Sequence, residues 1–343
     1  MMIVDTLKKI RLGHELSEDE VSASISELLD GSVSSAQTGA FLMGLSQRGE
    51  TSAEITGAAK VLRSRAKVIS APHGAIDCCG TGGDHSNSLN ISTAVAFVVA
   101  ACGVPVAKHG NRAASSQSGA ADVLEAMGIN LNLSMDACER ALHDLGFCFL
   151  MAPHHHASLK PLSALRKELG FRTIFNLLGP LANPADTKLQ LLGVFDKDFI
   201  LPMAEALKAL GTQHAMVVHG CDGMDEITLA GETYYAHLED GTISEGILTP
   251  QDFGLDPIQA EDIRGGDASY NATQLIGLLK GDDTAYRRIV LANAAAALFI
   301  AGHVAEIPSG VERASEVIDN GQVMKLFESY RQFTQEQLRE GAS

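Results

Sequence analysis

The sequence has no excess of basic residues. Its 26 lysines and arginines face 42 aspartates and glutamates, so the 343-residue chain carries a formal net charge of −16 at pH 7. Proteins that bind nucleic acid or anionic membranes over a broad surface need a basic face to supply the affinity. We therefore expect neither a nucleic-acid partner nor a membrane partner, although a local cationic pocket is compatible with this charge.

Long apolar runs and paired cysteines are also missing. The two most apolar segments, 91–107 and 289–302, are shorter than the roughly 20 residues that cross a bilayer. Near the start of the chain, Asp5 and Lys8–Lys9 stand where a signal peptide would carry its apolar core. The six cysteines form no CxxC motif, which favours buried reduced thiols over a redox or metal site. These features predict a cytoplasmic protein.

The first seventy residues have the pattern of helices alone. Three capping boxes, Ser17–Glu20, Ser34–Gln37 and Thr51–Glu54, each come before apolar residues at helical spacing. Residues 1–70 are therefore expected to form a helical domain. Such a bundle is too small to bury all its apolar faces, so it should pack on the rest of the chain, on a second copy, or on both. Segment 70–75 is the predicted linker.

After the linker the pattern changes to alternating strands and helices. Short apolar segments predict strands at 76–79, 104–107, 147–151, 188–195 and 214–219. Helices are predicted between them at 91–102, 119–127 and 199–210. This alternation indicates an α/β fold with a mostly parallel central sheet. The predicted larger domain covers 75–343, with short strands at 226–247 and a helical C-terminal region after about 270.

A glycine-rich segment, CGTGGD at 79–84, follows the first predicted strand directly. Open α/β sheets bind ligands at the carboxyl ends of their strands. Glycine lets a backbone turn tightly and bring its N–H groups against an oxyanion. The segment matches neither a P-loop nor a dinucleotide fingerprint. By itself it is compatible with a phosphate cradle or with a simple turn.

The surroundings of this glycine segment favour the phosphate interpretation. The 37 residues from His85 to Ala121 contain no Asp or Glu, where the chain average would place about 4.5. They do contain Lys108, His109 and Arg112, together with many hydroxyl and amide side chains. Charge-assisted hydrogen bonds to phosphate would explain a region kept free of carboxylates. The alternative is a segment of small residues that packs tightly.

Two further segments concentrate charge. Segment 154–172 is basic and contains three consecutive histidines, 154–156, but consecutive side chains point apart and no zinc-ligand spacing follows. Histidines that line a polar site are therefore favoured over a zinc site. Asp222, Asp225 and Glu226 come just after the predicted strand 214–219. Carboxylates that act together with substrate phosphates are typical Mg²⁺ ligands, and a solvated acidic turn is the alternative.

Five motifs in order carry a family resemblance: GTGGD (80–84), NIST (90–93), KHGNRAASSQSGAADVLEAMG (108–128), LRKELGFRTIFNLLGPLANP (165–184) and HGCDGMDEIT (219–228). Over nearly its whole length the chain resembles the anthranilate phosphoribosyltransferases of tryptophan biosynthesis, in the nucleoside phosphorylase-like phosphoribosyltransferase family. The resemblance implies a homodimer formed through the helical domain, with segment 160–180 beside that domain. It also implies transfer of the 5-phosphoribosyl group from phosphoribosyl pyrophosphate to the amine of anthranilate, with Mg²⁺ as cofactor at two ions per subunit.

The same resemblance implies roles for individual residues. It assigns catalysis to Lys108, Asn111 and Arg166, and metal binding to Ser92, Asp225 and Glu226. It assigns anthranilate binding, including its access route, to Gly80, Asn111, Pro153, His155, Arg166 and Gly179. It assigns phosphoribosyl pyrophosphate binding to Gly80, Gly83, Asp84, Ser88, Asn90, Ile91, Ser92, Thr93, Lys108, His109, Gly110, Asn111, Arg112, Ala113, Ala114, Ser115, Ser116 and Ala120. Ser88 stands where the family usually has Thr, and Ala120 where Ser is common.

Two rival functions share this expected fold. A pyrimidine nucleoside phosphorylase has a comparable glycine loop and basic region but needs no Asp–Glu metal pair, so HGCDGMDEIT argues against it. A non-catalytic nucleic-acid-binding relative should be basic and have degraded motifs, whereas this chain is acidic and its motifs are intact.

Overall fold

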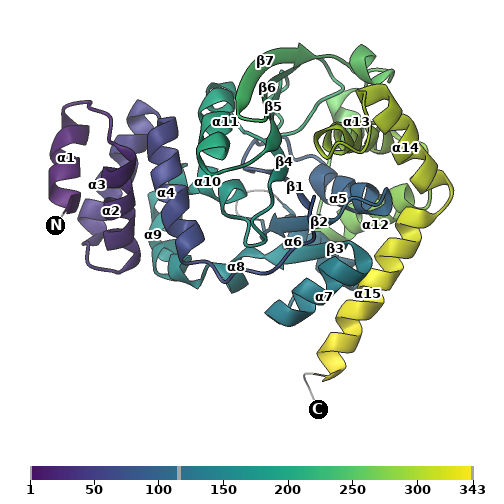
Figure 1. Cartoon of the computed structure of the whole chain (residues 1–343), viewed down its shortest axis with the longest axis horizontal. Coiled ribbons are helices and arrows are strands. Elements are labelled where there is room, and N and C mark those ends of the chain that lie inside the picture. The colour runs from purple at the N-terminus through teal and green to yellow at the C-terminus, as the bar shows by residue number, and fades with distance from the viewer. Residues whose placement is uncertain (1, 114–116, 341–343) are drawn as a thin grey trace.

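A computed structural model describes residues 2–113 and 117–340. Four helices form a bundle at one end of the molecule (Figure 1): α1 (Met2–Arg11), α2 (Glu18–Leu29), α3 (Ser35–Arg48) and α4 (Ser52–Ser64). The three predicted capping boxes are confirmed. At the start of α2, α3 and α4 the hydroxyl of the N-cap residue accepts a backbone N–H three residues on, and the Glu or Gln at that position bonds back.

The larger part is built on one seven-stranded sheet. Its strands are β1 (Ile76–Gly80), β2 (Val106–Gly110), β3 (Phe147–Met151), β4 (Leu189–Gly193), β5 (His214–Gly220), β6 (Thr233–Glu239) and β7 (Thr242–Leu248). Their order across the sheet is β3-β2-β1-β4-β5-β6-β7. The first five pair in parallel, and β6 and β7 continue the sheet antiparallel. The predicted mostly parallel α/β fold is confirmed.

Helices pack on both faces of the sheet, and further helices pack outside these or against the bundle. The helices that follow the bundle are α5 (Ile91–Ala101), α6 (Ala120–Ala126), α7 (Met135–Leu145), α8 (Ala152–His155), α9 (Ser163–Leu169), α10 (Ile174–Leu178), α11 (Ile200–Ala209), α12 (Ala268–Leu279), α13 (Ala285–Ile300), α14 (Ile307–Asp319) and α15 (Gln322–Glu340). Short 3₁₀ turns lie at 157–162, 180–182, 197–199, 250–253 and 260–263. The predicted helices 91–102, 119–127 and 199–210 correspond to α5, α6 and α11. Helices α7, α8 and α10 were not predicted from the sequence, and the predicted second strand begins two residues before β2.

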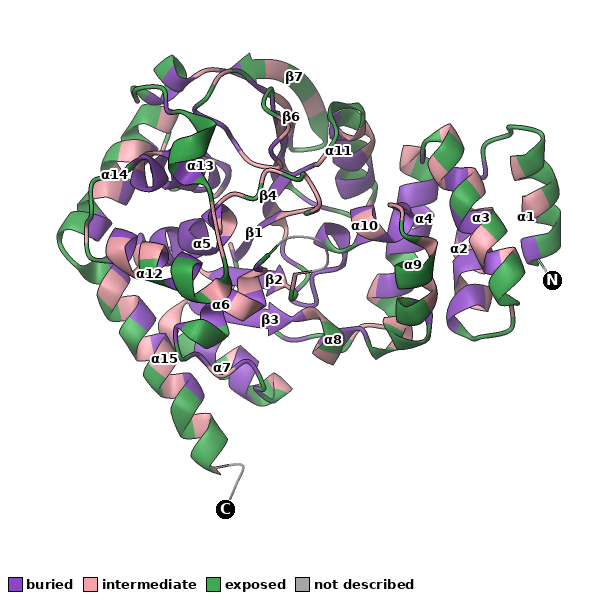
Figure 2. Cartoon of the chain, turned by 180° about the vertical axis from the view of Figure 1, so that it is seen from behind, coloured by how far each residue is buried: buried purple, intermediate pink, exposed green. Residues whose placement is uncertain are grey.

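The two faces of the sheet belong to different apolar cores. Cys78 and Leu191 point to the core that contains α5 and α13, two helices buried nearly all round. Their neighbours Cys79 and Leu192 point to the other face, whose core also contains Leu62 of the bundle. In Figure 2 strands β2 and β3 and helix α5 are accordingly mostly purple, while the outer strand β7 and outer helices such as α15 show much green. The bundle therefore buries one of its faces against the rest of this chain.

Segment 160–180 bridges the two parts. Helix α9 contacts α3, and α10 contacts α3 and α4. Ile174, Leu177 and Leu178 are buried in the same core as the bundle residues. A site on this segment is therefore held by the bundle on one side and by the sheet on the other.

The prediction that all the cysteines are buried is wrong for one of them. Five cysteines are buried, as predicted, but Cys221 is exposed because it lies in the loop that leaves β5. All six are free thiols. Within the described ranges, no helix is both long and apolar enough to cross a membrane.

Candidate active site

The glycine loop leaves the carboxyl end of β1 and turns beside an acidic side chain. Gly80 has no room for a Cβ, because the carboxylate of Asp225 fills that space. Gly82 and Gly83 have φ angles of +69° and +75°, a backbone conformation that favours glycine. The N–H of Gly82 donates to Asp225 Oδ2 at 2.7 Å. The glycines therefore let the loop pack directly on the acidic segment.

The acidic pair sits at the same edge of the sheet, after β5. The N–H of Ser92, in the first turn of α5, donates to Glu226 Oε1 at 3.0 Å. Burial and the Asp225 charge raise the pKa of Glu226 to about 8. Burial and nearby Asp84 likewise raise the pKa of Asp225. Three carboxyl groups thus crowd together, and a cation beside them would lower the cost of their ionisation.

Lys108 is the cation that the protein itself places nearby. It lies on β2 and is only 2 % exposed. Its Nζ donates to the carbonyl oxygen of Cys78 at 2.6 Å and to Ser92 Oγ at 3.1 Å. A buried ammonium group is costly unless it is paired and hydrogen-bonded, and the coulombic effect of Lys108 lowers the pKa of Glu226. Positive and negative charge therefore meet at the start of α5.

A cavity of about 350 Å³ opens beside this charged cluster. Its lining includes the glycine loop with Lys108 and Ser92, and also Arg166 and Phe175 from the segment 160–180. The Arg166 guanidinium lies over the Phe175 ring, 5.4 Å from its centroid. Burial lowers the pKa of Arg166, and in the described ranges no carboxylate forms an ion pair with it. Arg166 is thus available to an anionic group in the cavity.

Backbone carbonyl groups fix the orientation of two histidines in the cavity lining, His109 and His156. His109 Nδ1 bonds the carbonyl oxygen of Gly179 at 3.1 Å, and His156 Nε2 bonds that of Ala182 at 2.9 Å. A carbonyl only accepts, so these ring nitrogens carry the protons. The other nitrogens, His109 Nε2 and His156 Nδ1, are buried and have no hydrogen-bond partner among the described residues. Burial and the neighbouring histidines lower the pKa of His109 to about 3, which keeps its ring neutral.

The structure brings many of the predicted site residues together. Those that line the cavity are Gly80, Gly83, Ser92, Lys108, His109, Gly110, Asn111, Arg112, Ala113, Ala120, Arg166 and Gly179. Asp225 contacts this wall through Gly82, and Glu226 contacts it through Ser92. Ala114, Ser115 and Ser116 lie outside the described residues.

Other predicted residues face elsewhere. Pro153 is exposed, and His155 is buried with its Nδ1 on the carbonyl oxygen of Lys67 at 2.7 Å. Asn90 is held by Asn271, and its carbonyl oxygen by Tyr286. None of these, nor Asp84, Ser88, Ile91 or Thr93, lines the cavity where the structure describes it.

Arg112 lines the cavity, but its charge is already paired. Its two terminal nitrogens donate to Glu125 at 2.6 Å each, and Nη1 also donates to Asp122 at 3.1 Å. These acids come just after the acid-free segment in the sequence, and helix α6 turns them back onto it. A phosphate would have to compete with them for Arg112.

Other residues of the cavity lining had no individual role assigned from the sequence, although some lie in segments singled out there, such as 79–84 and 154–156. These residues are Leu62, Cys79, Thr81, Gly82, Gly119, Ala152, His156, Leu159, Phe175, Asn176, Pro180 and Ala182. Phe175, Asn176, Pro180 and Ala182 lie inside the motif 165–184, so that motif was the available signal. Nothing in the sequence distinguishes His156 from His155, because only the fold decides which ring turns toward the cavity.

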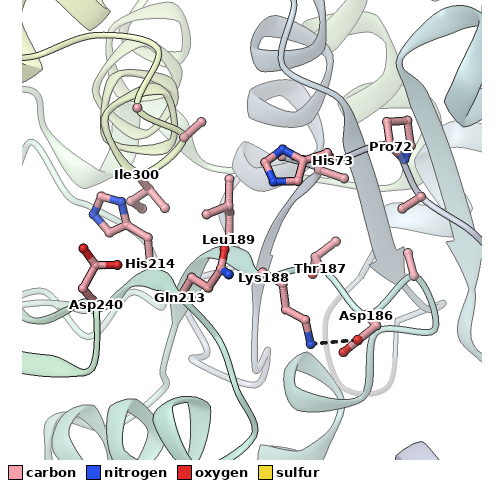
Figure 3. A pocket seen from close by; sticks show the side chains of 16 residues that line it. Pro72, His73, Asp186, Thr187, Lys188, Leu189, Gln213, His214, Asp240 and Ile300 are labelled. Atoms are coloured by element: carbon pink, nitrogen blue, oxygen red, sulfur yellow. Dashed lines mark ion pairs between the residues drawn. The ribbon is translucent and has the colours of Figure 1, made fainter.

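A second cavity of about 540 Å³ opens at the opposite edge of the sheet, where the strands begin (Figure 3). Its lining includes His73, Gln213, His214 and Lys188. Lys188 is neutralised by Asp186, 2.7 Å away, as the dashed line shows. The glycine loop and the acidic pair lie at the other end of the strands. The smaller cavity is therefore the candidate active site.

Comparison with known proteins identifies the same two-part architecture. The glycosyl transferase family, a/b domain, matches residues 73–324, and the helical bundle domain of that family matches residues 4–66. An anthranilate phosphoribosyltransferase of Novosphingobium aromaticivorans is 52 % identical over 308 residues, covering 90 % of this chain and 93 % of the relative. One of Azorhizobium caulinodans is 48 % identical over 329 residues and covers 96 % of each chain.

Solved structures of anthranilate phosphoribosyltransferases have the same fold as this chain. The anthranilate phosphoribosyltransferase of Thermus thermophilus superimposes with a TM-score of 0.91 at 39 % identity, covering 96 % of this chain and 99 % of that one. The Saccharomyces cerevisiae enzyme in complex with phosphoribosyl pyrophosphate and Mg gives a TM-score of 0.88 at 26 % identity, with 97 % and 98 % covered.

The chain belongs to the glycosyl transferase family whose members join a helical bundle to an α/β domain. Within that family it belongs with the anthranilate phosphoribosyltransferases. The resemblance found in the five sequence motifs is thereby confirmed.

Proposed function

We propose that this chain transfers the 5-phosphoribosyl group of phosphoribosyl pyrophosphate to the amine of anthranilate, giving N-(5-phosphoribosyl)anthranilate and pyrophosphate. One observation carries the proposal: a single cavity is lined both by the glycine loop and by Arg166. Two anionic substrates therefore find separate recognition groups in one site. The names of the relatives support the same reaction.

The phosphate end of the donor belongs at the glycine loop. The amino end of the 11-residue helix α5 lies beside it, and a helix N-terminus attracts anions through its free N–H groups. Lys108 adds a fixed positive charge next to Ser92. In the reaction, negative charge grows on the departing pyrophosphate. Groups held rigidly before the reaction stabilise that charge with little reorganisation.

Ser92, Asp225 and Glu226 fit a Mg²⁺ site that the substrate completes. Burial and mutual repulsion raise the pKa values of the two carboxyls, and a bound cation would favour their ionised forms. In the described ranges no three His, Cys, Asp or Glu side chains are placed to hold a metal ion by themselves, and in our proposal the phosphate oxygens of the substrate complete the site. Mg²⁺ bound there would neutralise the pyrophosphate that leaves. We propose two ions per subunit.

The part of the cavity lined by Arg166 and Phe175 suits anthranilate. The planar guanidinium of Arg166 matches a carboxylate in a bidentate way, which a lysine does not. Phe175 lies against that guanidinium and offers an aromatic surface. The amine of anthranilate is neutral at pH 7, so the mechanism needs correct positioning rather than a strong base.

We also propose a homodimer that forms through the helical domain of residues 1–70, with 75–343 as the catalytic domain. The outer end of the bundle exposes Met2, Leu12 and Met43 on or beside α1 and α3. Light scattering should report twice the chain mass. Substitution of Leu12 and Met43 by Glu should yield a monomer that keeps its circular dichroism spectrum. The free thiols support a cytoplasmic location.

One assay tests the reaction. The pure protein is incubated with anthranilate, phosphoribosyl pyrophosphate and Mg²⁺ while the fluorescence of anthranilate is followed. Loss of fluorescence that needs all three components supports the proposal. Cleavage of a pyrimidine nucleoside by inorganic phosphate would support the phosphorylase instead. Absence of both activities, with tight binding of nucleic acid, would support the non-catalytic relative.

A further inference from the structure

Arg172 lies behind the glycine loop, between α9 and α10. Its Nη2 donates to the carbonyl oxygen of Gly83. Its guanidinium lies over the ring of Phe195, 4.2 Å from the centroid. Arg172 is not among the residues that line the cavity. It therefore contacts the back of the loop and reaches the site only through it.

Phe195 also contacts the glycine loop through its backbone. The N–H of Phe195 donates to Thr81 Oγ1 at 3.0 Å, and the N–H of Thr81 donates to the carbonyl oxygen of Gly193 at 3.0 Å. Thr81 and Gly83, the residues on either side of Gly82, are thus both tied to the pair formed by Arg172 and Phe195. The backbone of Gly82 is therefore restrained at both of its neighbouring residues.

The same residue is attached to the helical bundle. Ser46, on α3, donates its hydroxyl to the carbonyl oxygen of Arg172 at 2.9 Å. The position of the bundle and the position of the glycine loop are therefore linked through one residue.

The loop needs such a restraint because of its own composition. Gly82 and Gly83 carry no side chains that would limit their backbone freedom, and glycine loses more conformational entropy on ordering than any other residue. Without an external contact, the peptide groups that face a phosphate would be ordered only when the ligand binds, which weakens binding. An arginine suits the task because its plane stacks on an aromatic ring while its edge donates.

We infer that Arg172 is a positioning residue for the phosphoribosyl pyrophosphate site: clamped on Phe195, it holds the Gly82–Gly83 peptide in its ligand-binding conformation. The inference rests on the proposed function for the identity of the ligand. It assigns to Arg172 no contact with either substrate.

The test compares Arg172→Ala and Arg172→Lys with a matched control, Arg63→Ala. Arg63 also joins the bundle to the larger part, donating to the carbonyl oxygen of Leu181 at 2.6 Å, and its hydrogen-bond partners Leu181, Asp186 and Leu210 all lie outside the glycine loop. Fixing the backbone of one residue changes an equilibrium constant on the order of tenfold. We therefore expect both Arg172 variants to raise the KM for phosphoribosyl pyrophosphate by about 10- to 100-fold, with less than about a threefold change for anthranilate. Arg63→Ala should lower the melting temperature and leave both KM values unchanged.

Phe195→Leu separates positioning from direct contact. It keeps the charge of Arg172 and removes its platform, so positioning predicts a rise in the KM for phosphoribosyl pyrophosphate of about fivefold or more. An unchanged KM in Phe195→Leu, a Lys variant that behaves as wild type, or equal effects on both substrates would overturn the inference. Calorimetric binding of Mg²⁺–pyrophosphate gives a readout without turnover. If wild type binds pyrophosphate but forms no product, the proposed function fails, while the loss of binding in Arg172→Ala still tests the clamp.

Discussion

Replacing Asp225 and Glu226 by Asn and Gln should stabilise the protein at alkaline pH while it removes activity. Both carboxyls accept N–H groups, from Gly82 and Ser92, and an amide oxygen can accept these bonds too. The two substitutions therefore keep the shape of both side chains and the hydrogen bonds from Gly82 and Ser92, but they remove two negative charges. In wild type without metal, these charges repel each other and Asp84.

The sign and size follow from the raised pKa of Glu226. Its folded pKa of about 8 lies above the ordinary value of 4.5, so between these values the folded state binds more protons than the unfolded state. The free energy of unfolding then falls as pH rises, by about 1.4 kcal/mol per pH unit for each such proton. For Glu226 alone the loss between pH 6 and pH 8 is about 2 kcal/mol. The raised pKa of Asp225 adds to it with the same sign.

Urea unfolding in EDTA at pH 6 and pH 8 measures this difference. Wild type should lose stability over that interval, and the double variant should lose about 2 kcal/mol less. In the fluorescence assay with Mg²⁺, turnover of the variant should fall by about 100-fold or more. Asp222→Asn, a nearby acid whose carboxylate binds the Thr228 hydroxyl, is the control and should keep activity. An unchanged pH dependence would refute the electrostatic reasoning, and full turnover would refute the metal assignment.

Three further outcomes are expected. Arg166→Ala should raise the KM for anthranilate by about 30- to 1000-fold, since a charged hydrogen-bonded pair is lost; equal damage to the KM of phosphoribosyl pyrophosphate would contradict its role as carboxylate ligand. Lys108→Met should lower turnover by about 100-fold or more through loss of a fixed charge at the pyrophosphate, and normal turnover would exclude that role. His214 and His237 share a 2.6 Å hydrogen bond between their Nε2 atoms, and burial lowers the pKa values of both rings. Below about pH 6.5 the unfolded state therefore binds protons more readily than the folded state, and stability falls. The variant His237→Asn should lose less resistance to urea than wild type between pH 7 and pH 5. An acid sensitivity as steep as in wild type would show that this pair is not responsible.

The local signals in the sequence determined much of the architecture. Capping boxes at Ser17, Ser34 and Thr51 fix helix starts through contacts within four residues. Strand 147–151 was predicted with its observed bounds, because a continuous buried apolar run is typical of a parallel strand. The α/β alternation then placed the glycine loop and the acidic segment at one edge of the sheet.

Tertiary structure decided how those residues are used. Arg112 is isolated from acids in the sequence, yet folding pairs it with Glu125 and Asp122. Arg172 lies in the basic segment 154–172 and in the motif 165–184, but its partners lie far away in the sequence, and only the packing of α3, the glycine loop and Phe195 brings them to it. Side-chain direction and long-range partners depend on how distant segments meet, whereas propensity and periodicity report only on near neighbours. The sequence by itself therefore determined the elements and the edge of the sheet that carries the chemistry. The fold decided which charges remain free to meet a substrate.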